Sequence, residues 1–390
     1  MQKRCKKIYN PKIYNRKEIN NKMKFICNQN ILAQAINIVI KACATRSTNP
    51  LLECILITAT NTTLTLMGNN LEMGIEKTIE GEILENGKIA IDAKLFSEII
   101  KKMPQGDIKM ATINETQITI TSGKSRFTLQ TLDTSHFPTL PDVSLKQSLT
   151  ISQLELKNLI KQTIFSVAQE ESRPTLTGEK FEVENGQLSL VAIDGFRIAF
   201  RTISLNNKNL SIEKVIPAKT LMEITKILSN ENNDEVTICF GENHILFNLI
   251  DTTIVSRLLE GEFLRYKDIF SNDFETKIIV NRNEFLMSIE RSALMSKEGG
   301  KNPIRFNITQ DTLIITSNTD IGNSLEEIDI ILTGMPLKIA FNPRYLIDAL
   351  KNIEDDEICI NFLSKTAPAV IMPINSDKYR YLVLPIRVTD

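Results

Sequence analysis

The chain has 390 residues, 42% hydrophobic and 24% charged, as in soluble globular proteins, and this length favours two to four domains over one core. No run of 18 apolar residues occurs, so we expect no membrane-spanning helix. The six cysteines are scattered without C-x-x-C spacing, which argues against a zinc site or a disulfide framework and favours a reducing cytoplasm.

The net charge of −1 is unevenly distributed along the chain. Residues 1–22 carry eight Lys or Arg and one acid, whereas residues 23–390 carry 38 basic and 46 acidic residues. The basic leader lacks the apolar centre of a secretory signal. Three interpretations remain: a disordered tail, a targeting segment, or a start codon placed too early. We favour the third because Met23 directly begins a predicted strand.

The first third of the chain predicts two strand-rich halves. A strand at 25–28 precedes an amphipathic helix at 29–42, and strands follow at 51–60, 63–68 and 72–79. The inward face of this helix is predicted to carry Leu32, Ala35, Ile36 and Val39, and its other face Gln34, Asn37 and Lys41. A hairpin at 118–132 turns at Ser122 and Gly123, and prolines suggest a boundary at 140–148.

The other two thirds repeat this order. Helices are predicted at 152–166, with Leu156, Leu159, Ile160 and Thr163 inward and Lys157 and Lys161 outward, and at 283–295. Glu184, Asn185 and Gly186 predict a tight hairpin turn, and a linker is expected near 261–275. We therefore expect the leader at 1–22 and domains at 23–145, 146–273 and 274–390.

A short unit at the centre of each third supports this division. Residues 89–103, 215–228 and 339–353 each combine a few β-prone residues with an amphipathic helix. Asp92, Pro217 and Asn342 precede these helices and lie 125 residues apart each time. Asp and Asn cap helices, and Pro is tolerated at a helix start. A fixed period of this length indicates repeated domains.

The repeat predicts an α+β fold in which each domain is a pair of β-α-β-β-β halves. One helix on an antiparallel sheet buries one face of each, so all helices lie on one side and all sheets on the other. Sheets that pair onward at each edge leave no open strand only in a closed object. We therefore expect a ring or arc with the helices inside and the antiparallel sheets outside.

Basic residues on the predicted helices suggest what the inner side contacts. A phosphate backbone suits basic helices within an acidic body, whereas basic residues in a last helical turn also simply complement the helix dipole. The helical candidates for DNA contact are Lys41, Lys101, Lys102, Lys157, Lys161, Lys226, Arg291 and Lys351, and Lys219, Arg282 and Arg344 lie on the same helices.

No catalytic motif is recognisable. His136 and His244 are far apart in the sequence, and G-x-x-x-x-G-K-[ST], G-x-G-x-x-G, H-E-x-x-H and G-x-S-x-G are all missing from it. We expect no enzymatic activity, cofactor or metal.

Three stretches resemble the bacterial DNA polymerase sliding clamps, the beta subunits of replicative polymerases. They are residues 49–75 (NPLLECILIT…), 165–200 (FSVAQEESRP…DGFRIAF) and 381–388 (YLVLPIRV), and the likeness runs from Met23 to the end. The resemblance implies three DNA-clamp domains per chain and a head-to-tail homodimer that closes around duplex DNA without catalysis. It implies that Arg46 contacts DNA and that Phe127 meets Leu294 and Met295 of the neighbouring subunit.

The resemblance also implies a cleft between the second and third domains that binds short peptides of the replicative polymerase, the clamp loader and repair proteins. The matching positions are Leu176, Ile193, Gly195, Phe196, Arg197, Ile198, Leu264, Ile269, Asn342, Tyr345, Pro368, Leu382, Val383, Leu384, Pro385, Ile386 and Arg387. Many members have proline at the position of Leu264 and histidine at that of Phe196. Two alternatives stay open: a scaffold that binds peptides without DNA, and an enzyme whose site lies at a domain interface.

Overall fold

The computed structural model describes residues 22–169, 173–270, 273–295, 302–320 and 322–387. The basic leader, apart from Lys22, lies outside the described residues. The chain divides into two compact units, which are considered separately: unit 1 comprises residues up to 152 together with 233–257, and unit 2 comprises 153–232 together with residues from 258 onward.

The described residues form six α-helices, each preceded by a strand. The helices are α1 Gln29–Val39, α2 Ala93–Lys102, α3 Gln153–Lys161, α4 Ala218–Ile227, α5 Arg282–Ala293 and α6 Pro343–Leu350. Short 3-10 helices are η3 Ile40–Ala42, η4 Pro50–Glu53, η5 Ile164–Ser166, η6 Pro174–Thr177 and η7 Lys267–Ile269.

Twenty-six strands complete the described part of the fold. In the first third they are β1 Lys24–Asn28, β2 Cys54–Thr60, β3 Thr63–Asn69, β4 Met73–Glu80, β5 Glu82–Glu85, β6 Gly87–Asp92, β7 Asp107–Asn114, β8 Gln117–Ser122 and β9 Ser125–Gln130. In the second they are β10 Ser148–Ser152, β11 Gly178–Glu184, β12 Gln187–Ile193, β13 Arg197–Ser204, β14 Ile212–Pro217, β15 Glu235–Phe240, β16 His244–Asn248 and β17 Thr252–Arg257. In the third they are β18 Thr276–Asn281, β19 Ile304–Ile308, β20 Thr312–Thr319, β21 Gly322–Asp329, β22 Ile331–Gly334, β23 Leu337–Phe341, β24 Glu357–Phe362, β25 Ala369–Pro373 and β26 Tyr379–Val383.

This order confirms three tandem α+β domains made of β-α-β-β-β halves. The second domain follows the pattern without additions, and the first and third each add one short strand, β5 or β22, at the equivalent place. These strands pair with β1 and β18, the first strands of their domains. The repeat predicted from the sequence is therefore present at the level of individual elements.

The predicted starts of the central helices are confirmed. The side chain of Asp92 accepts a hydrogen bond from the Leu95 amide at 2.7 Å, and that of Asn342 accepts one from the Arg344 amide at 3.0 Å. Pro217 occupies the same position before α4 without a side-chain cap. Asp92 and Asn342 thus each supply an acceptor for a free amide of the first helical turn. Pro217 supplies no acceptor, and it has no backbone N–H of its own that would need one.

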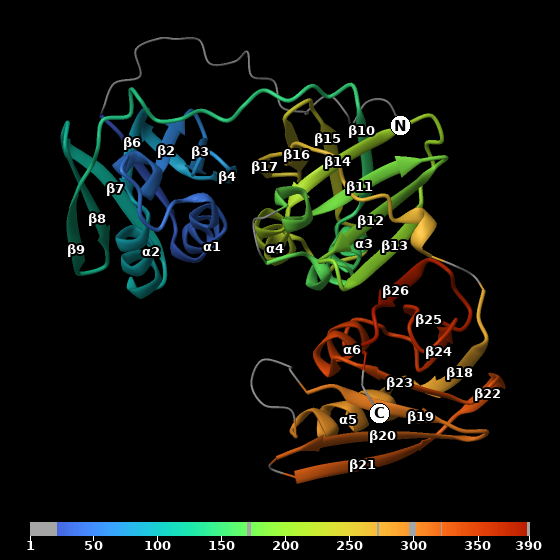
Figure 1. Cartoon of the computed structure of the whole chain (residues 1–390). Helices are drawn as coiled ribbons and strands as arrows, with labels where there is room; N and C mark the ends of the chain where they lie inside the picture. Colours follow the sequence, from blue (N-terminus) through green and yellow to red (C-terminus); the bar gives the residue numbers. More distant parts are fainter. Residues whose placement is uncertain (1–21, 170–172, 271–272, 296–301, 321, 388–390) are drawn as a thin grey trace. The chain divides into compact units, whose positions relative to one another are not determined.

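In unit 1, two sheets carry helices α1 and α2. The five-stranded sheet has the order β5-β1-β7-β8-β9, and the eight-stranded sheet has the order β10-β15-β16-β17-β4-β3-β2-β6. β17 pairs with β4 antiparallel, so strands of the first and second domains form one sheet (Figure 1). Helix α1 turns Leu32, Ala35, Ile36 and Val39 inward, and all four are buried as predicted.

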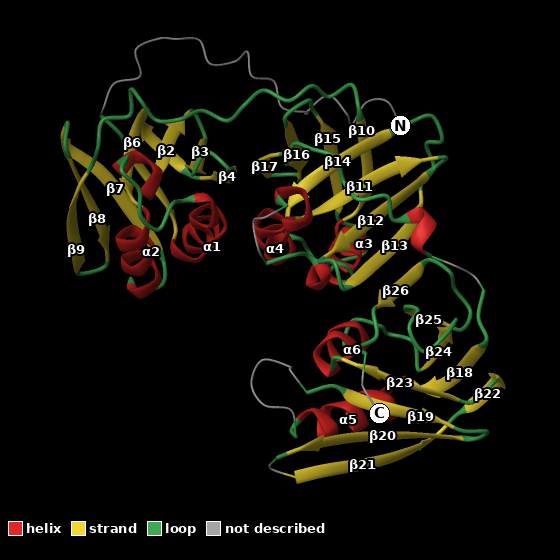
Figure 2. Ribbon diagram, viewed as in Figure 1, coloured by secondary structure: helices red, strands yellow, loops and turns green. Residues whose placement is uncertain are grey.

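In unit 2, a nine-stranded sheet has the order β14-β11-β12-β13-β26-β25-β24-β18-β22, and a four-stranded sheet has the order β21-β20-β19-β23. β13 pairs with β26, which joins strands of the second and third domains. Figure 2 shows α5 and α6 in red beside the strands of the third domain. Its core contains a chain of neighbouring rings, Phe285, Phe306, Phe341 and Phe362, with centroids 5.5–6.4 Å apart.

A tight turn between β11 and β12 fixes strand register as predicted. Asn185 and Gly186 both have positive φ, 52° and 74°, and connect the paired residues Glu184 and Gln187. Only turns with positive φ match the twist of a two-residue hairpin, which is why Asn-Gly is the preferred pair.

Two predicted elements differ from the structure. The helix predicted at 152–166 is α-helical only from Gln153 to Lys161, and the strand predicted from residue 51 begins at Cys54. Near the end of α3 the buried Thr163 hydroxyl lies 2.9 Å from the Leu159 carbonyl, a local bond that competes with helix continuation. Before β2, Asn49 caps the Leu51 amide and Pro50 begins η4, so residues 51–53 are a helical turn.

Glu179 on β11 is fully buried without a counter-charge. The Thr163 hydroxyl oxygen lies 2.9 Å from Glu179 Oε1, within hydrogen-bond distance, and Oε2 has no partner among the described residues. Burial raises the pKa of this carboxyl well above 4.5. The folded chain therefore holds a proton on Glu179 at a pH where the unfolded chain has lost it.

We expect Glu179→Gln to flatten the pH dependence of stability. Because the folded-state pKa is raised, the protonated carboxyl stabilises the fold fully below about pH 4.5, and this contribution falls by up to about 1.4 kcal/mol per pH unit as pH rises towards the folded-state pKa. Urea unfolding at pH 5 and pH 8, compared between wild type and variant, measures the difference. Glu155→Gln, an exposed glutamate on α3, is the control. Equal pH slopes for wild type and Glu179→Gln would contradict the expectation.

Candidate functional site

Four of the residues predicted for the peptide cleft form an apolar cluster in unit 2. Leu176, Ile193, Ile198 and Leu382 are all buried and pack together with Val370. They come from η6, β12, β13 and β26, which the nine-stranded sheet and its connections bring side by side. The cluster therefore gathers residues from two of the three stretches that the resemblance indicated, 165–200 and 381–388.

Four further cleft residues expose large apolar side chains. Phe196 is 58% exposed, and Leu264, Ile269 and Leu384 are 38–40% exposed. The Leu384 amide donates to the Phe196 carbonyl at 2.9 Å, which fixes the segment after β26 beside the loop before β13. The Phe196 ring stacks against Tyr345 of α6 at 6.3 Å. Exposed apolar side chains in such number are typical of a binding surface.

Arg197 connects the second and third domains within unit 2. Its Nε donates to Asp194 Oδ2 at 2.8 Å, its Nη1 to Asp348 Oδ2 at 2.7 Å, and its Nη2 to the Phe165 carbonyl at 2.6 Å. The guanidinium lies 4.5 Å from the centroid of the Tyr345 ring. Burial alone lowers the pKa of Arg197. Its neighbours Tyr381, Asp348 and Asp194 raise this pKa by more than burial lowers it, so the side chain stays charged.

The turn before β13 explains the glycine of the predicted site. Gly195 has a φ of +94°, and a Cβ there would meet no atom within 4 Å, so the requirement is conformational rather than steric. Asp194 Oδ1 accepts from the amides of Phe196 and Arg197 at 2.9 and 3.1 Å. The turn thereby presents Phe196 outward and Arg197 inward.

The remaining predicted cleft residues play different parts. Val383 points to the opposite side of the sheet from Leu382 and belongs to the third-domain core. Asn342 caps α6, and the Tyr345 carbonyl accepts from the Tyr381 hydroxyl at 2.8 Å. Pro368 precedes β25, and the chain after β26 carries Pro385, Ile386 and the exposed Arg387; the Ile386 amide donates to the Ala340 carbonyl at 2.8 Å.

The basic residues predicted for DNA contact fall into two groups. Lys226 pairs with Glu223 at 2.6 Å, Arg291 with Glu326 and Lys351 with Glu290 at 2.8 Å. Lys41 on η3 is partly buried and has interactions of its own. Exposed side chains without a recorded ion pair in the described part of the chain are Arg46, Lys101, Lys102 and Lys161.

Lys157 has a structural contact that its sequence spacing did not indicate. Its ammonium donates to the Leu228 carbonyl at 3.0 Å and to Asn230 Oδ1 at 2.8 Å, so it caps the carboxyl end of α4. Burial and the neighbouring Lys161 lower its pKa. The contact is with the end of another helix, whereas the helix-dipole alternative concerned basic residues in the last turn of their own helix, such as Lys161 on α3. Because Lys161 is exposed and makes no such contact with α4, it is the better probe of DNA contact on α3.

Of the three residues predicted for subunit contact, Phe127 lies on an edge strand, whereas Leu294 and Met295 follow α5. β9 lies at one edge of the five-stranded sheet and exposes Phe127, and β21 lies at one edge of the four-stranded sheet and exposes Leu325. Leu294 follows α5 and is 74% exposed, whereas Met295 is partly buried. An exposed edge is a template for pairing with a further strand.

Sequence reasoning missed the partners of these site residues. Asp348 and the Phe165 carbonyl, which hold Arg197, lie 151 and 32 residues from it. An available signal was Asp194, three residues before Arg197 at the start of a predicted strand. Phe200, Tyr266 and Phe270, which extend the apolar cluster, carried no signal that distinguished them from other core residues.

No group of three or more His, Cys, Asp or Glu within the described ranges could hold a metal ion. The five cysteines that the structure describes are free thiols, and burial raises the pKa of Cys27 to about 12. Helices long and apolar enough to cross a membrane are also missing from the described residues.

Comparison with known sequence families gives one result along the whole chain. The N-terminal domain of the DNA polymerase III beta subunit matches residues 23–141, the central domain matches 150–264, and the C-terminal domain matches 267–387. The beta sliding clamp of Staphylococcus aureus (strain Mu50) is 36% identical over 375 residues, which covers 94% of this chain and 99% of that protein.

Solved structures agree with the sequence comparison. The DNA polymerase sliding clamp of Bacillus subtilis superposes with a TM-score of 0.92 at 34% identity and covers 94% of this chain and 100% of its own. A putative DNA polymerase III beta subunit of Eubacterium rectale superposes with a TM-score of 0.90 at 41% identity, covering 93% and 99%. The chain therefore belongs to the DNA polymerase III beta subunit family, the beta sliding clamps.

Proposed function

We propose that this chain is a DNA sliding clamp, a processivity factor that encircles duplex DNA and tethers the replicative polymerase without catalysing a reaction. The observation that carries the proposal is the triplicated domain whose sheets continue from one domain into the next, through β17–β4 and through β13–β26. The outer sheets of the first and third domains keep the open edges β9 and β21, and pairing of these edges between two copies would close the object.

The two edge strands are complementary in character. β9 exposes Phe127 and Arg126, whereas β21 exposes Leu325, Glu327 and Asp329. Phe127 and Leu325 can form an apolar cross-strand pair, which favours a heterologous contact between β9 of one copy and β21 of the next. We propose a head-to-tail homodimer on this basis, with Leu294 and Met295 near the same junction.

The DNA contact in this proposal is made through phosphates alone. Arg46, Lys101, Lys102 and Lys161 offer exposed positive charge on a chain whose residues 23–390 are acidic overall. Phosphate contacts position a protein on a duplex and carry no sequence information. A closed ring with few such contacts is retained by topology and still moves along the duplex.

The partners in this proposal bind through the exposed apolar residues of the cleft. A peptide that buries two apolar side chains gains about 1.5–3 kcal/mol from each. With backbone hydrogen bonds this gives micromolar affinity, about −8 kcal/mol. Affinity of this order lets the polymerase, the clamp loader and repair proteins exchange on one clamp.

Retention on DNA after loading tests the proposal. The full chain is loaded by a bacterial clamp loader onto nicked circular DNA, and half of the sample is then linearised at a single site. We expect the protein to stay on circles through gel filtration at 0.5 M salt and to leave linear DNA within minutes. Electrostatic contacts alone are largely lost at this salt concentration, so retention reports closure.

The other results of this experiment have distinct meanings. Equal loss from circles and linear DNA would contradict encirclement and favour a peptide-binding scaffold. Equal retention on both would indicate binding that is independent of topology and would also overturn the proposal. Sedimentation at micromolar concentration gives an independent check, because the proposal expects about twice 44.1 kDa.

A further inference from the structure

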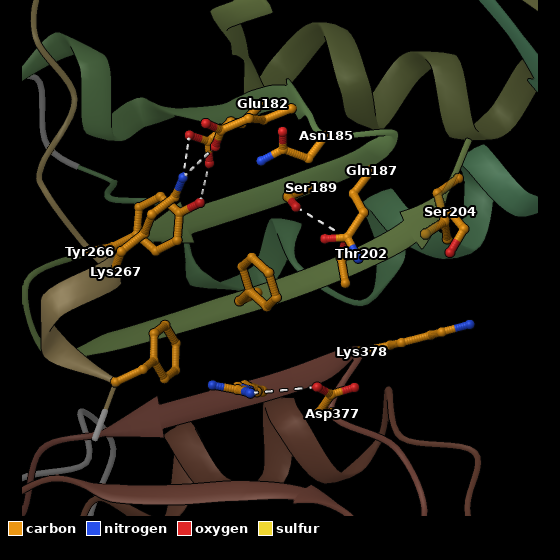
Figure 3. Close-up of a pocket in the computed structure, with 15 residues that line it drawn as sticks. Glu182, Asn185, Gln187, Ser189, Thr202, Ser204, Tyr266, Lys267, Asp377 and Lys378 are labelled. Carbon is orange, nitrogen blue, oxygen red and sulfur yellow. Dashed lines mark hydrogen bonds and ion pairs between the residues drawn. The ribbon is translucent and has the colours of Figure 1, made fainter. Parts of the chain in front are cut away.

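A second cavity lies on the nine-stranded sheet of unit 2. It has a volume of about 390 Å³ and is lined by β11, β12, β13, β26 and the segment around η7 (Figure 3). Its lining includes Phe200, Lys267, Asp377, Lys378 and Arg380. None of these five residues is among the predicted cleft residues. Small-ligand and peptide sites commonly have volumes of this order.

Strand register makes this cavity a continuation of the cleft. Ile198 pairs with Leu382, and two residues further along the same strands Phe200 pairs with Arg380. Residues two apart on a strand share a face and lie about 7 Å from each other. The apolar cluster and the cavity are therefore successive parts of one sheet face, with Phe200 between them.

Aromatic rings form the shared wall. Phe200 lies 6.0 Å from the Tyr266 ring and 6.1 Å from the Phe270 ring, centroid to centroid. All three line the cavity and also pack against the cluster that contains Ile198 and Leu382. A chain leaving the cleft in this direction passes over an apolar surface before it reaches the charged end.

The acidic side of the cavity is partly neutralised. The Lys267 ammonium lies 2.9 Å from Glu182 and 3.0 Å from Glu184, and the Tyr266 hydroxyl donates to Glu182. Figure 3 shows Tyr266 and Lys267 joined to Glu182 by these contacts. One ammonium thus serves two carboxylates, so this end of the cavity keeps a net negative charge and does not attract a further carboxylate.

The basic side of the cavity is not neutralised. Arg380 is only 26% exposed, its Nε is buried without a partner in the described part of the chain, and its one ion pair is a 3.8 Å contact to Asp377. Asp377 is 82% exposed, so this pair contributes little. The neighbouring Lys378 is exposed and adds a second positive charge. A half-buried guanidinium with an unpaired Nε lacks the carboxylate that its geometry fits.

We propose that this cavity binds an acidic side chain that flanks the apolar motif of a partner peptide seated in the cleft. The carboxylate of an Asp or Glu accepts from Arg380, and an adjacent apolar side chain packs on Phe200 and Phe270. The inference deepens the proposed function, on which it rests, by assigning a preference for acidic residues next to the motif. At about 3.3 Å per extended residue, two to four residues span the distance from Leu382.

Peptide selection tests the preference. A phage-displayed library of random 12-residue peptides is selected on the immobilised full chain, on Arg380→Ser and on the double variant Phe196→Ala with Leu384→Ala. We expect the wild type to enrich an apolar motif with Asp or Glu at a fixed spacing. Arg380→Ser should keep the apolar motif and lose the acidic position, and the cleft variant should lose the motif. Arg305→Ser, on an exposed arginine of β19 outside the cavity lining, is the matched control.

Affinities of one selected peptide make the test quantitative. By fluorescence polarisation, replacing its acidic residue by the matching amide should weaken binding to wild type about tenfold, as expected for a hydrogen bond to a charged group. The same replacement should leave binding to Arg380→Ser unchanged. Arg380→Lys, which keeps the charge but not the forked donors, should recover part of the tenfold difference, and circular dichroism confirms folding of each variant.

Three outcomes overturn the inference. An apolar motif without an acidic preference would refute it while leaving the proposed peptide cleft intact. An acidic preference that persists on Arg380→Ser would place the carboxylate elsewhere. Selection of no apolar motif on the wild type would refute the peptide cleft itself, and this inference with it.

Discussion

Replacing Arg197 by methionine is expected to lower the free energy of unfolding of unit 2 by about 3 kcal/mol. The change leaves Asp194, 13% exposed, without its partner and removes the bonds to Asp348 and to the Phe165 carbonyl. Removing one member of a buried ion pair costs about 3–5 kcal/mol, and we take the low end because Asp348 is one third exposed and stays solvated.

The Arg197 expectation is measured by urea unfolding and by amide hydrogen exchange. Exchange should accelerate in α6 and in residues 165–167, because Arg197 is bonded to both segments. Asp348→Asn, which keeps the other bonds of Arg197, is the matched control and should lose about 1 kcal/mol. Unchanged exchange in α6 of Arg197→Met would show that the guanidinium does not hold the two domains together.

Local features of this fold could be predicted because the residues that cause them are neighbours in the sequence. Asp92 and Asn342 bond to amides within three residues of themselves, and Asn185 with Gly186 forms a turn by its own dihedral preferences. Because the central unit recurs every 125 residues, its predicted strand and helix could be assigned in all three domains. Helix burial followed for the same reason, since the apolar spacing on α1 requires one inward face whatever covers it.

The site could be predicted only in part because its contacts cross domains. Arg197 and Asp348 are 151 residues apart, and Lys157 meets the end of a helix 71 residues further on. The resemblance indicated both Leu382 and Val383 for the cleft, but adjacent strand residues face opposite sides. Only the pairing of β26 with β13 decides that Leu382 faces the cleft cluster and Val383 the core.

Replacing Phe196 and Leu384 together by alanine is expected to weaken partner-peptide binding by about a hundredfold or more while leaving stability nearly unchanged. Each side chain offers about 1.5–3 kcal/mol when a peptide covers it, and a tenfold change in affinity corresponds to about 1.4 kcal/mol. In the free chain Phe196 is 58% exposed and Leu384 is 38% exposed, so the double variant loses less buried area than the replacement of two core residues would.

Fluorescence polarisation with a library-selected peptide measures the loss, and urea unfolding verifies the fold of the Phe196 and Leu384 variant. Ile250→Ala is the control, because Ile250 is 92% exposed, equally apolar and part of unit 1. The two single variants should each bind the peptide at least about tenfold more weakly than wild type. A double variant that binds more weakly than the product of the two single effects would indicate coupling through the Leu384 amide and the Phe196 carbonyl, which are 2.9 Å apart.

Should the double variant bind as tightly as wild type, the peptide would be held by other residues, and the apolar surface around Phe196 would need a different occupant. Loss of binding with intact clamp retention on circular DNA would instead separate the two parts of the proposed function, since tethering depends on this surface and encirclement depends on the edges of β9 and β21.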